Sequence, residues 1–148
     1  MNDTEIIEIL LVEDNPNDVE LAIHALKKNN LANHIHTVRD GQEALDFIFG
    51  RNSYEGRHLA SGPRVVLLDL KLPKVDGLQV LKAIKEDPRT KAIPVVIMTS
   101  SREEQDLVAS YTLCVNSYII KPVDFAQFTD AVRQLGFYWL LLNKIPGP

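Results

Sequence analysis

Short apolar runs alternate along the chain with longer segments in which apolar residues recur every three or four positions. The runs are "IIEILLV" (6–12), "HIHTV" (34–38), "VVLLD" (65–69), "PVVIMT" (94–99) and "VNSYII" (115–120). They are rich in Val and Ile and are bounded by turn-forming residues, which is typical of buried strands. The pattern therefore predicts five strands.

The segments between these runs have the periodicity of amphipathic helices. A first helix is expected to begin with Asn15 as its N-cap and Pro16 at its first position. Its apolar stripe consists of Val19, Ala22, Ile23 and Leu26. A second stripe, which ends before Pro88, consists of Leu78, Leu81 and Ile84.

The last predicted helix has a recognisable start. Asp124 can cap it, and Gln127 stands at the reciprocal position of a capping box. Its inner face is expected to consist of Phe125, Phe128, Val132 and Leu135.

Five strands that alternate with five helical segments predict a (βα)5 fold of the α/β class. Because the strands are continuously apolar, helices should cover both faces of a mostly parallel five-stranded sheet. The 148 residues fit one domain, 1–148. Within it, residues 49–64 are expected to form a long polar loop and residues 136–148 an apolar C-terminal extension.

Composition narrows the classes of function. The net charge is −4 and no dense run of Lys or Arg occurs, so neither nucleic acid nor an anionic membrane is an expected partner. The single cysteine, Cys114, excludes an internal disulfide and fits a reducing compartment. The N-terminus lacks a basic leader, and the apolar run "FYWLLL" is too short to span a bilayer. We therefore expect a cytoplasmic protein.

Chemically useful side chains follow four of the five runs. They are Glu13 and Asp14, Asp69, Thr99 and Ser100, and Lys121, whereas Arg39 and Asp40 follow the second run without an evident role. The carboxyl ends of parallel strands meet at one edge of a sheet, where ligands bind. Each residue alone could be an ordinary cap, turn or solvated side chain, but together they favour a site.

Converging carboxylates repel each other unless a positive charge joins them. Mg²⁺ prefers a few carboxylate oxygens and keeps several waters. Together with a lysine and a hydroxyl, such a centre can hold a phosphoryl group, with Asp69 as the nucleophile.

These residues resemble those of a known family, the receiver domains of bacterial two-component response regulators. The motifs are "LLVEDN" (10–15), "LLDLKLPKVDG" (67–77), "VIMTSS" (96–101) and "YIIKP" (118–122), and the resemblance covers nearly all of the chain. It implies a flavodoxin-like fold and a signalling protein that accepts a phosphoryl group from a histidine kinase and then switches its protein contacts. It implies no enzymatic activity beyond self-catalysed phosphotransfer and dephosphorylation.

The resemblance also assigns roles. It makes Asp69 the phosphoacceptor, and the Mg²⁺ ligands are then Glu13, Asp14, Asp69 and the backbone carbonyl of Lys71. Thr99 and Lys121 would contact the phosphoryl group, and Thr99 and Tyr118 would form the switch pair. Lys71 and Ser101 would tune the phosphate lifetime, and the Lys121–Pro122 peptide is a candidate for the cis form.

The long loop and the apolar tail resemble a narrower group, the single-domain regulators that partner cyanobacterial phytochrome kinases. A phytochrome is therefore the candidate kinase. At about 100° per residue, the tail cannot place all its apolar side chains on the inner face of the last helix. A homodimer surface is predicted at Phe137, Tyr138, Leu140 and Leu141; the alternative is that the tail folds back on its own domain.

Three other functions are weighed. A phosphatase of the haloacid-dehalogenase type would need a second Asp two residues after the nucleophile, where Lys71 stands. A nucleotide- or flavin-binding module would need a glycine-rich loop, and "VEDNPNDVE" has no glycine. A phosphorylation-independent pseudo-receiver is disfavoured by the intact acidic site. The four histidines have no metal-ligand spacing and are expected to be surface or interface residues: His24, His34, His36 and His58.

Overall fold

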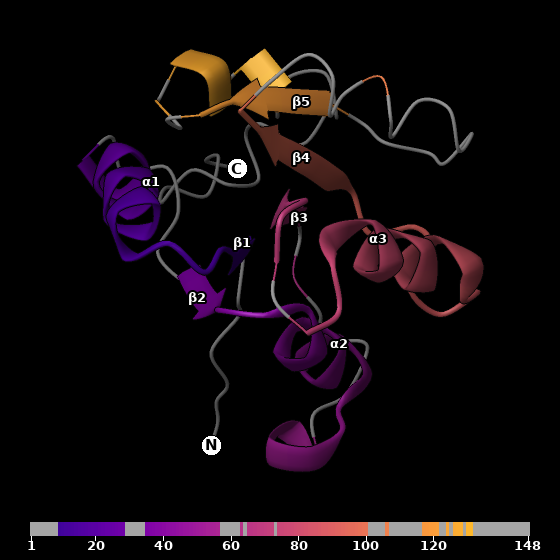
Figure 1. Ribbon diagram of the computed structural model, residues 1–148. Coiled ribbons are helices and arrows are strands. Elements are labelled where there is room, and N and C mark those ends of the chain that lie inside the picture. The colour runs from indigo at the N-terminus through magenta and orange to yellow at the C-terminus, as the bar shows by residue number, and fades with distance from the viewer. Residues whose placement is uncertain are drawn as a thin grey trace, which may run out of the picture.

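The computed structural model describes residues 9–28, 35–56, 63, 65–72, 74–100, 106, 117–121, 124, 126–128 and 130–131. Its five strands are β1 (Ile9–Val12), β2 (Ile35–Val38), β3 (Val65–Asp69), β4 (Val95–Thr99) and β5 (Ser117–Ile120). They form one parallel sheet in the order β2-β1-β3-β4-β5 (Figure 1). The predicted parallel five-stranded sheet is confirmed, and within the described residues each strand lies inside its predicted apolar run.

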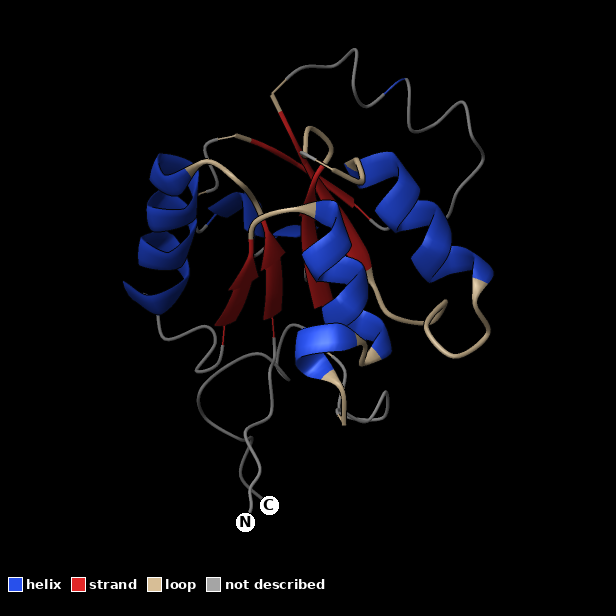
Figure 2. Ribbon diagram, turned by 60° about the horizontal axis from the view of Figure 1, so that its bottom comes forward, coloured by secondary structure: helices blue, strands red, loops and turns tan. Residues whose placement is uncertain are grey.

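Helices cover both faces of this sheet. Helix α1 (Pro16–Lys28) lies on one face, and helices α2 (Gly41–Phe49) and α3 (Gly77–Glu86) lie on the other (Figure 2). Successive residues of a strand point to opposite faces. Accordingly, Leu11 packs in the core cluster under α1 and Leu10 in the cluster under α2 and α3, and both are fully buried.

The predicted apolar stripes face these cores. In α1, Ala22 and Leu26 are buried, and Val19 and Ile23 pack against the same cluster. The N-cap is also as expected, because Asn15 Oδ1 accepts hydrogen bonds from the backbone N–H groups of the second and third helical residues. The α3 stripe is confirmed too, since its predicted members lie in or against the other core: Leu78, Leu81 and Ile84.

The last helix is described at 126–128 and 130–131, where Phe128 is fully buried. Asp124 Oδ1 accepts a hydrogen bond from the backbone N–H of Gln127 at 2.8 Å, as a cap should. The Gln127 amide, however, bonds Ile120, accepting from its N–H at 2.8 Å and donating to its carbonyl at 2.9 Å. The side-chain amide of Gln127 therefore makes the two hydrogen bonds to the Ile120 backbone that the backbone of a neighbouring strand would otherwise make. The other predicted inner-face residues lie outside the described residues: Phe125, Val132 and Leu135.

Part of the predicted loop 49–64 is ordered around a 3-10 turn, η1 (Asn52–Tyr54). The Tyr54 hydroxyl donates to Glu43 Oε2 at 2.8 Å and lies 3.1 Å from His36 Nε2. The His36 ring in turn stacks on Phe47, with 4.4 Å between ring centroids. The His36 side chain is half-buried within this packed group, and its partial exposure is compatible with the predicted surface position.

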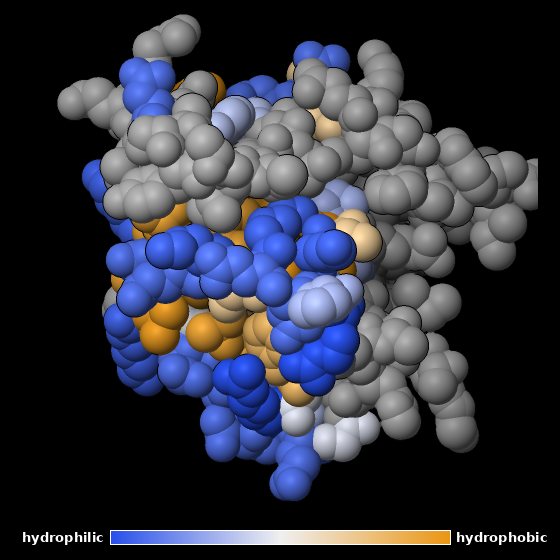
Figure 3. Space-filling view, turned by 90° about the vertical axis from the view of Figure 1, so that its right-hand side faces the viewer, coloured by the Kyte–Doolittle hydropathy of each residue, from blue (hydrophilic) through white to orange (hydrophobic). Residues whose placement is uncertain are grey.

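Among the residues that are coloured in Figure 3, hydrophilic side chains predominate, and apolar side chains show between them. None of the helices in the described part of the chain combines the length and the apolar character that a membrane span requires.

Candidate functional site

The sheet register brings the predicted site residues to one edge. Val12 of β1 pairs with Leu68 of β3, so Glu13 and Asp69 follow at the same level. Both carboxylates are almost fully buried, with exposed fractions of 1% and 4%, whereas Asp14 is exposed. One carboxylate oxygen from each of these three residues lies within 4.8 Å of the other two. This is the convergence that the strand ends predict.

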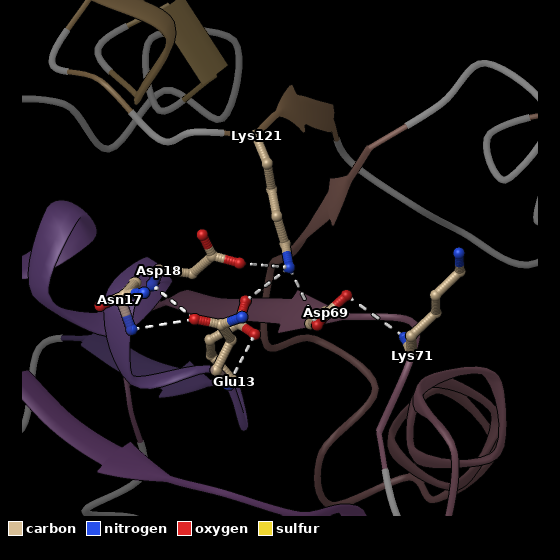
Figure 4. A network of polar contacts seen from close by, with 7 residues as sticks. Glu13, Asn17, Asp18, Asp69, Lys71 and Lys121 are labelled. Atoms are coloured by element: carbon tan, nitrogen blue, oxygen red, sulfur yellow. Dashed lines mark hydrogen bonds and ion pairs between the residues drawn. The ribbon is translucent and has the colours of Figure 1, made fainter.

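Lys121 enters the cluster from the end of β5. Its backbone N–H donates to the Thr99 carbonyl at 2.9 Å, which extends the pairing of β5 with β4. Its Nζ lies 2.9 Å from Glu13 Oε1, 3.1 Å from Asp69 Oδ2 and 3.1 Å from Asp18 Oδ2 (Figure 4). One ammonium group thus serves three carboxylates, and the sequence reasoning did not anticipate Asp18.

The charges of this cluster depend on each other. Burial raises the pKa of Glu13 to about 7, although Lys121 opposes the shift. Burial alone would lower the pKa of Lys121, but Glu13 and Asp69 raise it above its ordinary value. The lysine therefore carries a charge that only partly balances the acids around it.

The buried Glu13 has an oxygen without a hydrogen-bond donor. Its Oε2 accepts from the backbone N–H of Asn15 at 3.1 Å. Its Oε1 lies in ion-pair contact with Lys121 Nζ at 2.9 Å, but this contact lacks the geometry of a hydrogen bond. Three convergent carboxylates, two of them buried, are the donor set that a hard divalent cation prefers. The residues present fit such an ion.

Asp69 is held from two sides. Its Oδ2 accepts from Lys121 Nζ at 3.1 Å, and its Oδ1 accepts from the backbone N–H of Lys71 at 3.2 Å. The loop behind it is tight, because a Cβ on Gly77 would overlap the carbonyl oxygen of Asp69. Asp76 then starts α3 with a complete capping box to Gln79. The motif "KVDG" therefore fixes the position of the Asp69 backbone.

Thr99 and Tyr118 lie on adjacent strands of the sheet. Tyr118 pairs with Ile97, so Thr99 lies two residues further along β4 on the same face. Thr99 is fully buried, and Tyr118 is half-buried against the core under α2 and α3. Burial, and then the charge of Asp106, raise the pKa of Tyr118.

Several predicted residues lie outside the described residues, so the structure does not place them: Ser101, Pro122, Phe137, Tyr138, Leu140 and Leu141. Asp40, to which the sequence pattern gave no role, is the N-cap of α2. Its Oδ1 accepts from the backbone N–H of Glu43 at 2.7 Å.

The fold and this site define a class of protein. Residues 9–133 match the family model described as "Response regulator receiver domain", and the chain belongs to this family. The family consists of signalling proteins. The phosphatase and nucleotide-binding alternatives therefore give way to the receiver interpretation.

Among curated relatives, the chain is 45% identical over 140 residues to the probable methanogenesis regulatory protein FilR2 of Methanothrix harundinacea, covering 95% of this chain and 88% of that protein. It is 38% identical over 139 residues to response regulator Rcp1 of Synechocystis, covering 94% and 92%.

Solved structures show the same likeness. The bacteriophytochrome response regulator AtBRR aligns with a TM-score of 0.85 and 55% identity over 95% of this chain and 100% of that one. The Mn²⁺-bound form of Rcp1 aligns with a TM-score of 0.72 and 38% identity over 95% and 99%. The phosphorylated cyanobacterial phytochrome response regulator RcpA aligns with a TM-score of 0.73 and 38% identity over 97% and 100%.

Proposed function

We propose that this response regulator accepts a phosphoryl group from a histidine kinase onto Asp69, in a reaction that depends on a divalent metal ion. The observation that carries the proposal is the setting of Asp69. It is a buried carboxylate with one oxygen bonded to Lys121 and the other to the Lys71 backbone, beside Glu13 and Asp14. The phosphorylated state of the similar RcpA supports this proposal by analogy.

In the proposed step, one Asp69 oxygen attacks the phosphorus of a phosphohistidine. The P–N bond breaks, the imidazole leaves with its electron pair, and an acyl phosphate forms on Asp69. Lys121 stays close to Asp69 and neutralises part of the negative charge of the phosphoryl oxygens. Hydrolysis reverses the modification, because attack by water on the phosphorus releases phosphate and regenerates the carboxylate.

The side chains of Glu13, Asp14 and Asp69 and the backbone carbonyl of Lys71 would hold the ion, with Mg²⁺ as the proposed metal. When bound, the ion supplies positive charge to the phosphoryl oxygens. The Mn²⁺-bound form of Rcp1 supports a divalent ion by analogy. The residues of this chain orient the nucleophile and keep it buried.

The signal would leave the site through Thr99 and Tyr118. We expect the Thr99 hydroxyl to bond the phosphoryl group and the Tyr118 ring to move into the space that it vacates. Side chains of Lys71 and Ser101 would tune the phosphate lifetime. A Thr99→Ala variant should still be phosphorylated, but phosphorylation should no longer change its partner binding.

The partners follow from the same proposal. We propose a phytochrome-type histidine kinase as the donor, by analogy with the bacteriophytochrome and phytochrome regulators. Residues 1–148 would act as one receiver unit in the cytoplasm, where ATP-dependent kinases work.

A homodimer would use Phe137, Tyr138, Leu140 and Leu141. Sedimentation of the whole chain against a chain ending at Leu135 tests the dimer, and a monomeric whole chain at tens of micromolar, with and without phosphate, would reject it.

Intact-mass spectrometry after incubation with acetyl phosphate tests the central step. The wild type should gain one phosphoryl group with Mg²⁺ and none with EDTA, and Asp69→Asn should gain none. Asp76→Asn is the matched control, because it removes a nearby carboxylate that caps a helix, and it should be phosphorylated normally. Equal phosphorylation of Asp69→Asn would reject Asp69 as the acceptor.

A further inference from the structure

Lys121 has a third carboxylate partner that the proposed reaction does not use. Asp18 stands in the first turn of α1, and its Oδ2 accepts a hydrogen bond from Lys121 Nζ at 3.1 Å, the same distance as Asp69 Oδ2 (Figure 4). The two acids thus bond one ammonium group. Asp18 does not belong to the metal-type cluster found among the described residues, which consists of Glu13, Asp14 and Asp69.

A simpler role for Asp18 would be to stabilise the start of α1, where acidic side chains interact well with the helix dipole. That role does not require a contact with Lys121, and Asn15 already caps this helix end. Reaching Lys121 joins residues 103 positions apart in the chain. The Asp18 side chain is 30% exposed, and the Lys121 side chain that it contacts is 16% exposed. The contact therefore links the start of α1 to the site.

Of the three carboxylates around Nζ, Asp18 is the one that Lys121 can release most easily. The Glu13 side chain is 1% exposed and the Asp69 side chain 6%, so water cannot replace the lysine there. Asp18 is open enough to be solvated when the contact breaks. Burial thus ranks the partners, since an unpaired charge is least unfavourable where water reaches it.

We infer that Asp18 is a positioning residue that shares Lys121 with Asp69, and that a phosphoryl group on Asp69 takes Lys121 from it. This inference rests on the proposed function. In the unphosphorylated state Asp18 holds Nζ over the nucleophile. In the phosphorylated state its charge competes for Nζ and repels the phosphoryl dianion, which makes that state less stable.

Removing the charge of Asp18 should change the binding of cations and of anions in opposite directions. Asp18→Asn keeps the size of the side chain and removes one negative charge beside the site. Binding of a cation should then weaken, and binding of an anion at saturating Mg²⁺ should strengthen, each by roughly threefold to tenfold. A merely structural role predicts something else, because a misplaced Lys121 would weaken the binding of the anion as well.

Calorimetric titration of the whole chain tests this with two probes, Mg²⁺ alone and beryllofluoride, a phosphoryl mimic, at saturating Mg²⁺. The variants are Asp18→Asn, the charge-preserving Asp18→Glu, and Glu20→Gln, which removes a charge from an exposed position on the same helix. We expect opposite changes for the two probes in Asp18→Asn only, and wild-type behaviour in the other two variants.

Any other pattern overturns the inference. If both probes bind more weakly to Asp18→Asn, the residue is structural, and if neither changes, the contact has no consequence. Equal shifts in Glu20→Gln would show a general charge effect. Failure of the wild type to bind beryllofluoride and to gain phosphate would instead reject the proposed function, and this inference with it.

Discussion

Two pairs of acidic residues at the same edge of the sheet are used in opposite ways. Asp40 and Asp76 accept hydrogen bonds from backbone N–H groups three residues later and cap α2 and α3. Glu13 and Asp69 instead share a lysine that is 52 residues away from Asp69 in the chain. Each carboxylate of the first pair accepts a hydrogen bond from the helix that it caps. The second pair depends on a partner that the tertiary structure brings to it.

The contrast shows what separates an acidic residue that stabilises the fold from one that belongs to a reactive site. A capping carboxylate gains its partners as soon as the helix forms, so it stabilises the fold. A carboxylate buried beside other carboxylates raises the free energy of the folded state unless a cation or a lysine compensates. The site therefore retains a demand for positive charge, which metal binding can meet.

The largest expected effect comes from removing the shared lysine. Lys121→Met leaves Glu13 and Asp69 without their ammonium partner, which should lower the free energy of unfolding by about 3 kcal/mol. Saturating Mg²⁺ should restore part of this loss. Urea unfolding with and without Mg²⁺ measures both, with the exposed Lys27→Met as control. A loss no greater than that of the control would remove the distinction between the two pairs.

The next largest effect concerns the caps. Asp40→Ala and Asp76→Ala should each lower the free energy of unfolding by about 1 kcal/mol, because each leaves helix N–H groups unsatisfied. Neither should prevent phosphate uptake from acetyl phosphate. Thermal unfolding and intact-mass spectrometry on the same samples give the two readings. Loss of phosphate uptake in a folded cap variant would contradict the division between capping carboxylates and those of the reactive site.

A third effect, similar in size to that of a single cap, has the opposite sign. The pKa of Glu13 is raised to about 7, so its ionised form is disfavoured by folding at pH values above that. Glu13→Gln should therefore raise the free energy of unfolding by about 1 kcal/mol at pH 8 without metal. The gain should shrink as the pH falls toward 5, where Glu13 is protonated. Stability that falls at pH 8 would show that the contact with Lys121 outweighs the burial of the charge.

Much of this arrangement follows from the sequence. Apolar runs predict the strands because a parallel sheet covered on both faces leaves no polar position in its interior. The site edge is predictable for the same reason, since Asp69 directly follows such a run. The Asn15 cap is predictable because it depends only on its neighbours in the chain.

The parts that were missed depend on distant contacts. Asp18 looks like an ordinary first-turn acid until the fold brings Lys121 to it. The turn at 52–54 is set by Tyr54 reaching Glu43 and His36, which no local pattern records. Gln127 matches a capping box in the sequence, but its amide bonds the free edge of β5 at Ile120.

The central claim is that Asp69, and no other carboxylate at this edge of the sheet, accepts the phosphoryl group. Mapping the modified residue tests this claim most directly. Borohydride reduces an aspartyl phosphate to homoserine, so protein treated with acetyl phosphate and Mg²⁺ can be reduced, digested and sequenced by mass spectrometry. The account predicts homoserine at position 69 only, and none when EDTA replaces Mg²⁺. Homoserine at position 14, 18, 40 or 76, or equal modification in EDTA, would contradict it.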